Sequence, residues 1–317
     1  MTNGTDAIKV SGMSAKDYFA DHAVSRSQLH VLSKSPAHFK EAMESEEKQT
    51  AAFSFGTAFH ALILEPERFA DEYWIGDIDR RTSAGKELAA KLADEGKTQI
   101  STKDAEALLG MKASIEANKY ARVLIAKGEH ETSYFWRDEL SGIDCKCRPD
   151  CRTDLKSCSV IIDLKSCADA STEAFCKDAV KYGYDLQVAM YKEGVEKIEN
   201  KEHRFVFVAV EKTPPYAVNV LEANDKMYQK GLQDFRYYLG TLRECLDSGI
   251  FPSYNGNTDK ASEQQKRENN STIVKPKGDS VDTVNTIKPQ GNSVDTINPI
   301  KPRSNSDITE ATAAPYE

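Results

Sequence analysis

The chain has 317 residues, of which 39% are hydrophobic and 29% charged, enough for one large domain or two small ones with a sizeable core. Its 42 basic and 50 acidic residues give a net charge of −8, so any nucleic-acid-binding surface must be local. The first residues lack the basic-then-apolar order of a signal peptide, and the apolar stretch at 58–64 is far too short to cross a bilayer. We therefore expect a cytoplasmic protein without a membrane segment.

The first 130 residues are predicted to be mostly helical. Ser25, Ser35 and Ser101 are typical N-cap residues, and Pro36 fits the first position of a helix. Pro66 is expected to end an apolar helix that precedes it. The four helices expected in this region cover residues 25–32, 35–43, 53–64 and 101–117.

After Glu131 the sequence changes to short segments rich in β-branched and aromatic residues, with turn signals between them. Five strands are expected, at residues 132–138, 143–148, 159–165, 204–211 and 216–221. Two helices accompany them, at 171–199 with an interruption at Gly183, and at 224–248. This order predicts an α/β fold with a central mixed β-sheet flanked by helices and a helical N-terminal part.

From Asn255 onward the sequence is polar and repeats with a period of 13 residues, at 275–287 and again at 288–300. Scattered single Val and Ile residues bury too little area to offset the entropy of ordering, so this tail is predicted to be disordered. The predicted organisation is a folded domain at 1–254 and a low-complexity tail at 255–317. The tail serves either as a spacer or as a docking segment for a partner.

The densest chemical signal is Asp150 followed by the strand that carries Asp163 and Lys165. Residues two apart in a strand share a face, so Asp163 and Lys165 point the same way, while Leu164 points into the opposite, apolar layer. Asp150 is expected at the end of the preceding strand, where pairing can bring it beside Asp163. Two carboxylates there can bind a hard cation such as Mg²⁺, with the ammonium acting on the attacking water. The alternative is an ordinary surface Asp–Lys pair.

Three further features lie at suitable places in the sequence. Glu131 precedes the first strand and can add a third carboxylate to the same sheet edge. His60 lies within an apolar helix, where it is either a metal ligand or a hydrogen-bonded core residue. Gln187 and Tyr191 are four residues apart on one helix face, which is compatible with a role at the site or with ordinary packing.

In their order along the chain, these residues resemble the PD-(D/E)XK nucleases of the RecB-like branch, and more narrowly the nuclease domain of RecE-type exodeoxyribonucleases (exodeoxyribonuclease VIII). The residues that carry the resemblance are His60, Glu131, Asp150, Asp163, Lys165, Gln187 and Tyr191. Supporting stretches lie at 25–29, 35–39, 55–60, 79–86, 147–150 and 184–187. The resemblance covers about residues 10–254 and leaves out the repeat tail.

The resemblance implies a Mg²⁺-dependent exonuclease, with Mn²⁺ as a second usable ion, that degrades linear double-stranded DNA from 5′ ends and leaves 3′ single strands for recombination. It implies that Asp150 and Asp163 bind the metal, that Glu131 and His60 complete the coordination, and that Lys165 acts on the nucleophilic water. Gln187 and Tyr191 are then expected to position the active-site groups and the scissile strand. A single-strand annealing protein as partner and a ring-shaped homotetramer are implied by analogy.

The basic residues proposed to contact DNA are few, as the net charge requires. Arg80, Arg81 and Lys86 form the best local cluster, and Arg148 lies close in sequence to the proposed metal ligands. Each of them can equally be a solvated surface charge. We expect the double substitution Arg80→Ala with Arg81→Ala to weaken DNA binding and to flatten its salt dependence.

The seven cysteines offer a competing interpretation, because Cys145, Cys147 and Cys151 lie close together in the sequence. Paired Cys-X-X-Cys motifs, the stronger sign of zinc, are absent from the sequence, and so is the spacing typical of nucleases with an iron–sulfur cluster. Buried thiols without a ligand role are therefore predicted. Two other functions stay open at this point: another nuclease of the same superfamily, single-strand-specific or endonucleolytic, and a DNA-binding module without catalysis.

Overall fold

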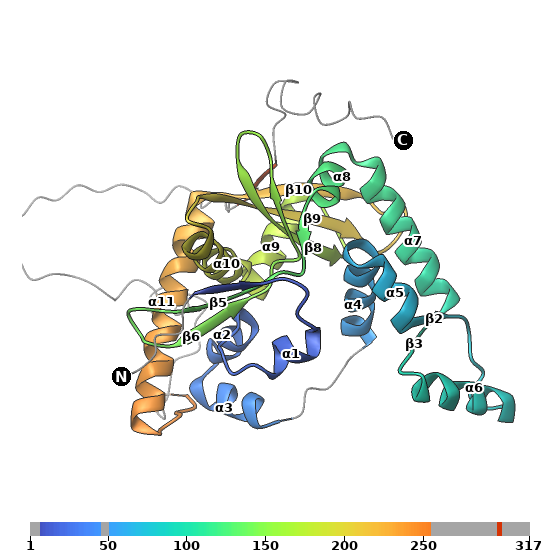
Figure 1. Cartoon of the computed structure of the whole chain (residues 1–317), viewed down its shortest axis with the longest axis horizontal. Helices are drawn as coiled ribbons and strands as arrows, with labels where there is room; N and C mark the ends of the chain where they lie inside the picture. The colour runs from blue at the N-terminus through green and yellow to red at the C-terminus, as the bar shows by residue number, and fades with distance from the viewer. Residues whose placement is uncertain (1–6, 46–50, 255–296, 300–317) are drawn as a thin grey trace, which may run out of the picture.

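The computed structural model describes residues 7–45, 51–254 and 297–299, and Figure 1 shows helices packed around a central sheet. That sheet has six strands, in the order β11 (Ile297–Pro299), β10 (Val218–Ala223), β9 (His203–Glu211), β8 (Ser159–Cys167), β7 (Cys151–Asp154) and β4 (Glu129–His130). A three-stranded sheet contains β1 (Ile8–Val10), β5 (Ser133–Arg137) and β6 (Asp144–Cys147), and a two-stranded one contains β2 (Tyr73–Ile75) and β3 (Thr98–Ile100).

The helices in chain order are α1 (Ala15–Ala20), α2 (Arg26–Leu32), α3 (Pro36–Glu44), α4 (Ala51–Leu64), α5 (Pro66–Glu72), α6 (Ser83–Asp94), α7 (Thr102–Ala117), α8 (Lys119–Ala126), α9 (Thr172–Tyr182), α10 (Tyr184–Glu199) and α11 (Asp225–Ser248). The central sheet is mixed, because β8 and β9 run parallel while β9–β10 and β7–β8 are antiparallel. The predicted class, an α/β fold with a mixed sheet flanked by helices, is confirmed.

Alternation along β8 and β9 creates two apolar layers, one on each face of the sheet. Ile161 and Phe207 belong to a core formed with α2, α9, α10 and α11, whereas Ile162 and Val208 belong to a core formed with α4, α7 and α8. Each of these side chains is fully buried, and burial of a side chain of this kind contributes about 1.5–3 kcal/mol. Both faces of β8 are therefore covered, and polar groups on this strand lie in a largely apolar interior.

The predicted helix starts are confirmed by their capping contacts. The Ser35 hydroxyl accepts a hydrogen bond from the His38 N–H, and the Ser101 hydroxyl accepts one from the Asp104 N–H. The apolar helix α4 ends at Leu64, just before Pro66 as predicted, and Pro66 is in addition the first residue of α5. Proline at the first position of a helix costs no hydrogen bond, because an N–H at that position has no acceptor within the helix.

The interruption predicted at Gly183 is also confirmed. Gly183 has φ +63° and ψ +45°, a left-handed conformation that ends α9 and allows α10 to start at the next residue. Further along, a Cβ at Gly231 would lie 1.8 Å from the carbonyl oxygen of Asp185, so glycine is what allows α11 to approach α10 this closely. The close contact with α11 therefore helps to hold the start of α10, next to the turn at Gly183, in position.

The arrangement of the strands differs from the prediction at Asp150. The residue was expected at the end of the 143–148 strand, whereas it directly precedes a separate strand, β7, which the sequence interpretation missed. Pro149 explains the break, because it has no N–H to continue the ladder between β6 and β7. Strand β6 consequently pairs with β5 in the second sheet, and β7 pairs with β8.

Most of the predicted tail, and with it the test of the boundary at 254, lies outside the described residues. Within the tail the structure describes only 297–299, which form β11 and pair antiparallel with β10 at the edge of the central sheet. The disorder of the tail therefore stays a prediction. Among the residues that the structure describes, no helix has the length and apolar character needed to span a bilayer.

Candidate metal centre

The proposed catalytic residues come from four parts of the fold that meet where β7 begins beside β8 in the central sheet. His60 lies on α4, Glu131 precedes β5, Asp150 precedes β7, and Asp163 and Lys165 lie on β8. The antiparallel register of β7 and β8 sets Cys151 opposite Ile162, so the chain brings Asp150 next to Asp163.

His60, Glu131 and Asp150 form the one group among the described residues whose His, Cys or carboxylate ligand atoms gather closely enough for a shared metal ion. One ligand atom from each lies within 4.8 Å of the others. The Nδ1 atom of His60 is 3.6 Å from Oδ1 of Asp150, and its Nε2 atom is 3.0 Å from the carbonyl oxygen of Leu164.

The tautomer of His60 follows from that carbonyl contact. A carbonyl oxygen only accepts, so Nε2 carries the hydrogen that it donates, and in the neutral imidazole the lone pair is on Nδ1. Nδ1 is then the atom that faces Oδ1 of Asp150 at 3.6 Å, an approach that is favourable when a positive charge is present, either a proton on Nδ1 or a cation between the two atoms. A histidine whose second nitrogen donates to a backbone carbonyl is a typical metal ligand.

Glu131 is held beside Asp150 by the backbone. It has φ +47°, in the left-handed region that few side chains adopt, and its N–H donates to the carbonyl oxygen of Asp150 at 3.1 Å. Burial, reinforced by the charge of Asp150, raises the pKa of Glu131 to about 8. A nearby cation would reverse this effect, because it favours the ionised carboxylate.

Asp150 is buried, and its Oδ2 accepts a hydrogen bond of 2.6 Å from the N–H of Leu164. Burial raises the pKa of Asp150, the charge of Asp163 raises it further, and His60 opposes the rise. The backbone of Leu164 thus contacts both Asp150 and His60. Its N–H donates to Asp150, and its carbonyl oxygen accepts from His60. The sequence interpretation missed this double contact, because it depends on backbone groups and not on residue type.

Asp163 is 1% exposed and is held from both sides. The side-chain amide of Gln187 donates to Oδ1, and the ammonium of Lys165 forms an ion pair with Oδ2. Oδ2 nevertheless receives no well-aligned hydrogen bond from the described residues. One lone pair of this buried carboxylate is therefore available to a cation.

Tyr191 lies one turn after Gln187 on α10, on the same helix face, as the sequence predicted. Its ring is half-buried against Phe205, with centroids 6.3 Å apart, and burial raises its pKa well above the usual value. The phenol is therefore neutral near pH 7. Its role in positioning the scissile strand stays a prediction.

The structure places the four basic residues proposed for DNA binding in two different settings. The guanidinium of Arg148 donates to the Ser133 hydroxyl and the Met13 carbonyl, each at 2.9 Å, and lies 4.4 Å from the Tyr18 ring centroid. These contacts attach the N-terminal segment to β6, so Arg148 has an internal structural role next to the centre.

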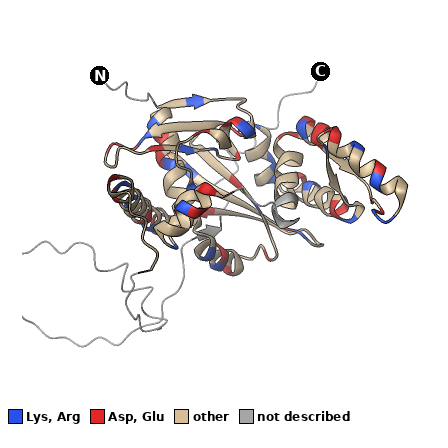
Figure 2. Ribbon diagram, turned by 90° about the horizontal axis from the view of Figure 1, so that it is seen from below, with Lys and Arg blue, Asp and Glu red and all other residues tan. Residues whose placement is uncertain are grey.

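The cluster of Arg80, Arg81 and Lys86 lies before and within α6, at the end of the molecule far from β8 (Figure 1). Arg81 is paired with Asp79 through contacts of 2.8 and 2.9 Å, and Arg80 reaches Gln99 at 3.5 Å. Figure 2 shows both signs of charge interspersed along the helices of this region. The structure therefore does not bring this cluster to the carboxylates, and its contact with DNA stays a prediction.

One residue beside the centre had no role assigned from the sequence. The ring centroid of Tyr184, at the start of α10, is 4.9 Å from Nζ of Lys165, which makes a cation–π contact. The residue belongs to a stretch that supports the family resemblance, but no spacing rule connects it with Lys165. The contact becomes visible only in the structure, where α10 packs against the sheet.

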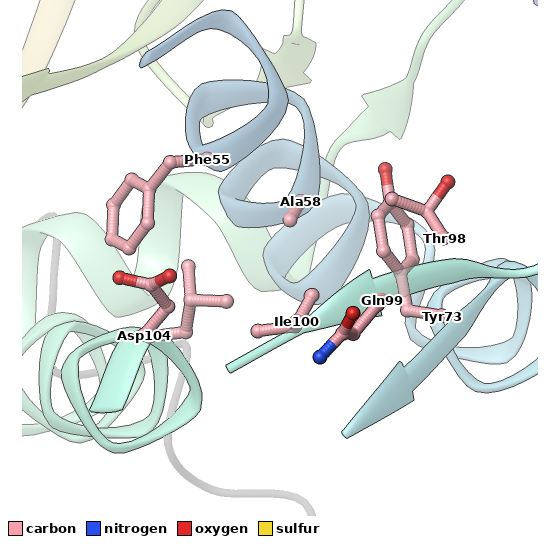
Figure 3. Close-up of a pocket in the computed structure, with 8 residues that line it drawn as sticks. Phe55, Ala58, Tyr73, Thr98, Gln99, Ile100 and Asp104 are labelled. Carbon is pink, nitrogen blue, oxygen red and sulfur yellow. The ribbon is translucent and has the colours of Figure 1, made fainter. Parts of the chain in front are cut away.

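A cavity of about 270 Å³ lies elsewhere, between α4, the β2–β3 pair and α7 (Figure 3). Phe55 and Ala58 line it from α4, and Ile100 and Asp104 lie opposite them. None of the proposed catalytic or metal-binding residues lines this cavity. The candidate catalytic residues therefore lie at the carboxylate cluster and not in this cavity.

The residues around this end of β7 fit a divalent cation on three counts. Nδ1 of His60 faces the Asp150 carboxylate at 3.6 Å, Glu131 and Asp150 bring two carboxylates together in a largely buried place, and Oδ2 of Asp163 has Lys165 as its charged partner without a well-aligned hydrogen bond. Carboxylate oxygens are the ligands that Mg²⁺ and Mn²⁺ prefer, and an imidazole nitrogen also admits softer transition metals.

Six of the seven cysteines are buried, as predicted, and Cys158 is half-buried. Cys145 and Cys147 lie in the apolar core between β6 and the helices, and Cys151 lies in the core on the other face of the sheet. The Cys151 thiol donates to the carbonyl oxygen of Leu124 at 3.6 Å, as a buried thiol without a ligand role does.

Comparisons with known proteins agree with the fold. Residues 25–264 match a family described as the PDDEXK-like domain of unknown function (DUF3799). Among solved structures, a "Putative exonuclease" from Eubacterium rectale is similar, with 15% identity, a TM-score of 0.54, and coverage of 86% of this chain and 97% of that one. The protein SSO0001 aligns over 72% of this chain and 96% of its own, with 15% identity and a TM-score of 0.26, which is too low to support an argument. No curated protein sequence matches the chain.

Proposed function

This chain belongs to the family of PDDEXK-like domains, and we propose that it is a metal-dependent nuclease that hydrolyses phosphodiester bonds of DNA. The observation that supports the proposal most is the convergence of His60, Glu131 and Asp150 within 4.8 Å, next to the buried pair of Asp163 and Lys165. An acid-rich centre with an adjacent ammonium, in an apolar sheet, is costly to fold and is explained by a reaction that needs it.

The residues divide into three roles. His60, Glu131, Asp150 and Asp163 would hold the metal ion, which when bound supplies charge neutralisation at the phosphate and makes water more acidic. The Lys165 ammonium is placed to stabilise negative charge that develops during hydrolysis. Gln187 holds Oδ1 of Asp163 and so directs Oδ2 of that carboxylate toward the centre.

The finer proposal is a Mg²⁺- or Mn²⁺-dependent exonuclease of the RecE type, which degrades linear duplex DNA from 5′ ends and leaves 3′ strands for an annealing partner. It rests on the sequence resemblance, and the solved structure described as an exonuclease supports it as an analogy. A homotetrameric ring around the duplex belongs to the same proposal. Such a ring needs positive charge only along its channel, so a net charge of −8 is compatible with it.

The test is digestion of linear duplex DNA labelled at its 5′ or 3′ end, with Mg²⁺, with Mn²⁺ and with a chelator. We expect degradation that needs the metal and releases the 5′ label first. A covalently closed plasmid should stay intact until it is linearised, and its cleavage would replace the exonuclease with an endonuclease. The Asp163→Asn variant is the matched control, and hydrolysis by this variant at the wild-type rate would remove the catalytic assignment.

A further inference from the structure

Two tyrosine rings extend from the candidate centre to the protein surface. The Tyr184 ring contacts the Lys165 ammonium, and the Tyr182 ring stacks on it, with centroids 6.0 Å apart and an interplanar angle of 28°. Tyr184 also packs on Phe207, at 5.7 Å and 29°. The order from interior to surface is therefore Phe207, Tyr184, Tyr182.

The turn at Gly183 between α9 and α10 is held in place by contacts from α2. The Arg26 guanidinium donates to the carbonyl oxygen of Gly183 at 2.9 Å and also to that of Tyr182. A Cβ at Gly183 would lie 2.8 Å from Nδ1 of His30, so α2 closes tightly on the glycine. The backbone that carries the two rings on either side of Gly183 is thus held in place before any ligand arrives, which lowers the ordering cost of binding.

Tyr182 is the exposed member of the pair. It is 42% exposed at the surface end of the stack, and the ammonium of Lys181 lies 4.8 Å from its ring centroid. Lys181 is itself exposed on a flexible side chain, so it can leave the ring when another group covers it. An exposed aromatic ring with a cation beside it is an arrangement with which proteins bind unpaired bases and their phosphates.

We propose that Tyr182, supported by Tyr184, stacks an unpaired base of the DNA strand that is being cleaved, with Lys181 facing a phosphate of that strand. The inference rests on the proposed nuclease function and deepens it, because it names the form of the substrate. The Tyr184 ring already stacks with Phe207 and with Tyr182, so a base can stack only on the exposed ring of Tyr182. The stack therefore accepts one base. The strand is then held open at the centre, and the contact is tolerant of sequence because every base has a π-face.

The experiment measures binding of a fluorescein-labelled single-stranded oligonucleotide by anisotropy, with Ca²⁺ in place of Mg²⁺. Base–aromatic stacking predicts that Tyr182→Ala weakens binding by about 5- to 150-fold, whereas Tyr182→Phe, which keeps the ring, binds as the wild type does. The matched control is Tyr237→Ala, at an exposed tyrosine on α11 that is 56% exposed. This control should bind as the wild type does.

A scan with one abasic nucleotide at each position identifies the contact itself. The wild type should lose affinity when the abasic position reaches Tyr182, and Tyr182→Ala should be insensitive at that same position. Wild-type affinity of Tyr182→Ala, or equal sensitivity of both proteins at every position, overturns the inference. If these binding effects appear without Mg²⁺-dependent cleavage, the nuclease proposal fails alone; if cleavage is found and Tyr182→Ala binds normally, the stacking proposal fails alone.

Discussion

Substitution of Lys165 by methionine removes a charge from the candidate centre and keeps most of the side-chain volume. The 1%-exposed Asp163 carboxylate then loses the cation paired with it. Removal of one partner of a buried pair costs about 3–5 kcal/mol, and we expect a loss near 3 kcal/mol because the Lys165 side chain is 19% exposed and already partly hydrated. This loss is the change in unfolding free energy expected for the metal-free protein.

Divalent metal should partly restore the stability of Lys165→Met and should not restore its turnover. Because a bound cation can replace the ammonium as the counter-charge of Asp163, saturating Mg²⁺ should narrow the stability gap between variant and wild type. Turnover should stay about 10²–10³-fold lower, because the electrostatic stabilisation of the transition state is lost. DNA affinity should change little, since Lys165 is assigned to the reaction and not to holding substrate.

The assay combines urea unfolding with and without Mg²⁺ and steady-state kinetics on linear duplex DNA. Lys177→Met is the matched control, because Lys177 is an exposed lysine paired with Glu173 on the surface of α9. It should leave stability and turnover unchanged. The reasoning is refuted if Lys165→Met loses DNA affinity as strongly as turnover, or if Mg²⁺ leaves the stability gap as wide as before.

Three further predictions concern other parts of the chain. Burial lowers the pKa of His203 in the folded protein. Below the unfolded pKa of about 6.5, the unfolded chain therefore binds a proton at His203 that the folded chain does not bind. The unfolding free energy should consequently fall from pH 7 to pH 5. Urea titrations at each pH should show a flatter dependence for His203→Gln, and an identical dependence would contradict the assignment. Burial raises the pKa of Cys167 to about 11 and that of Cys151 to about 12, so in a native thiol titration at pH 8 half-buried Cys158 should react first; fast reaction of all seven would contradict the buried state. If Arg80 and Arg81 contact phosphates, their double replacement by alanine should reduce the slope of log affinity against log salt by about 0.9 per lost contact, and an unchanged slope would show that the loop does not touch DNA.

Most of the described helices were predictable because their signals are local, whereas α1, α5, α6 and α8 were not predicted. Ser101 and Asp104 define the start of α7 within three residues, and Gly183 separates two helices by its own backbone conformation. Pro66 shows the limit of such signals, because the end of α4 before it was predicted whereas the start of α5 at the same proline was not.

The candidate centre was predictable in its residues and not in its connections. The alternation on β8 places Asp163 and Lys165 on one side, and the ion pair between them agrees with that prediction. The two backbone contacts of Leu164 and the cation–π contact of Tyr184 depend on how α4 and α10 pack against β8. Strand β7 was missed because its four residues, CRTD, are polar and too few to show a period.

Basic residues were the least predictable, because a positive charge in a sequence does not reveal its partner. Arg148 was proposed to contact DNA, which stays a prediction, and its hydrogen bonds to Ser133 and to the backbone of Met13 were not foreseen. Lys146 is 2% exposed and donates to the carbonyl oxygens of Tyr18 and Asp21, an arrangement that nothing in its neighbourhood indicates. Long-range contacts with the N-terminal segment decide both roles.

The central claim is that His60, Glu131, Asp150 and Asp163 share one divalent ion. The most direct measurement is an anomalous difference map from a crystal grown with Mn²⁺. We predict a peak bound by these side chains in the wild type, and loss of the peak in Glu131→Gln combined with Asp163→Asn. A map without a peak between these four side chains, or with the ion bound elsewhere, would contradict the account.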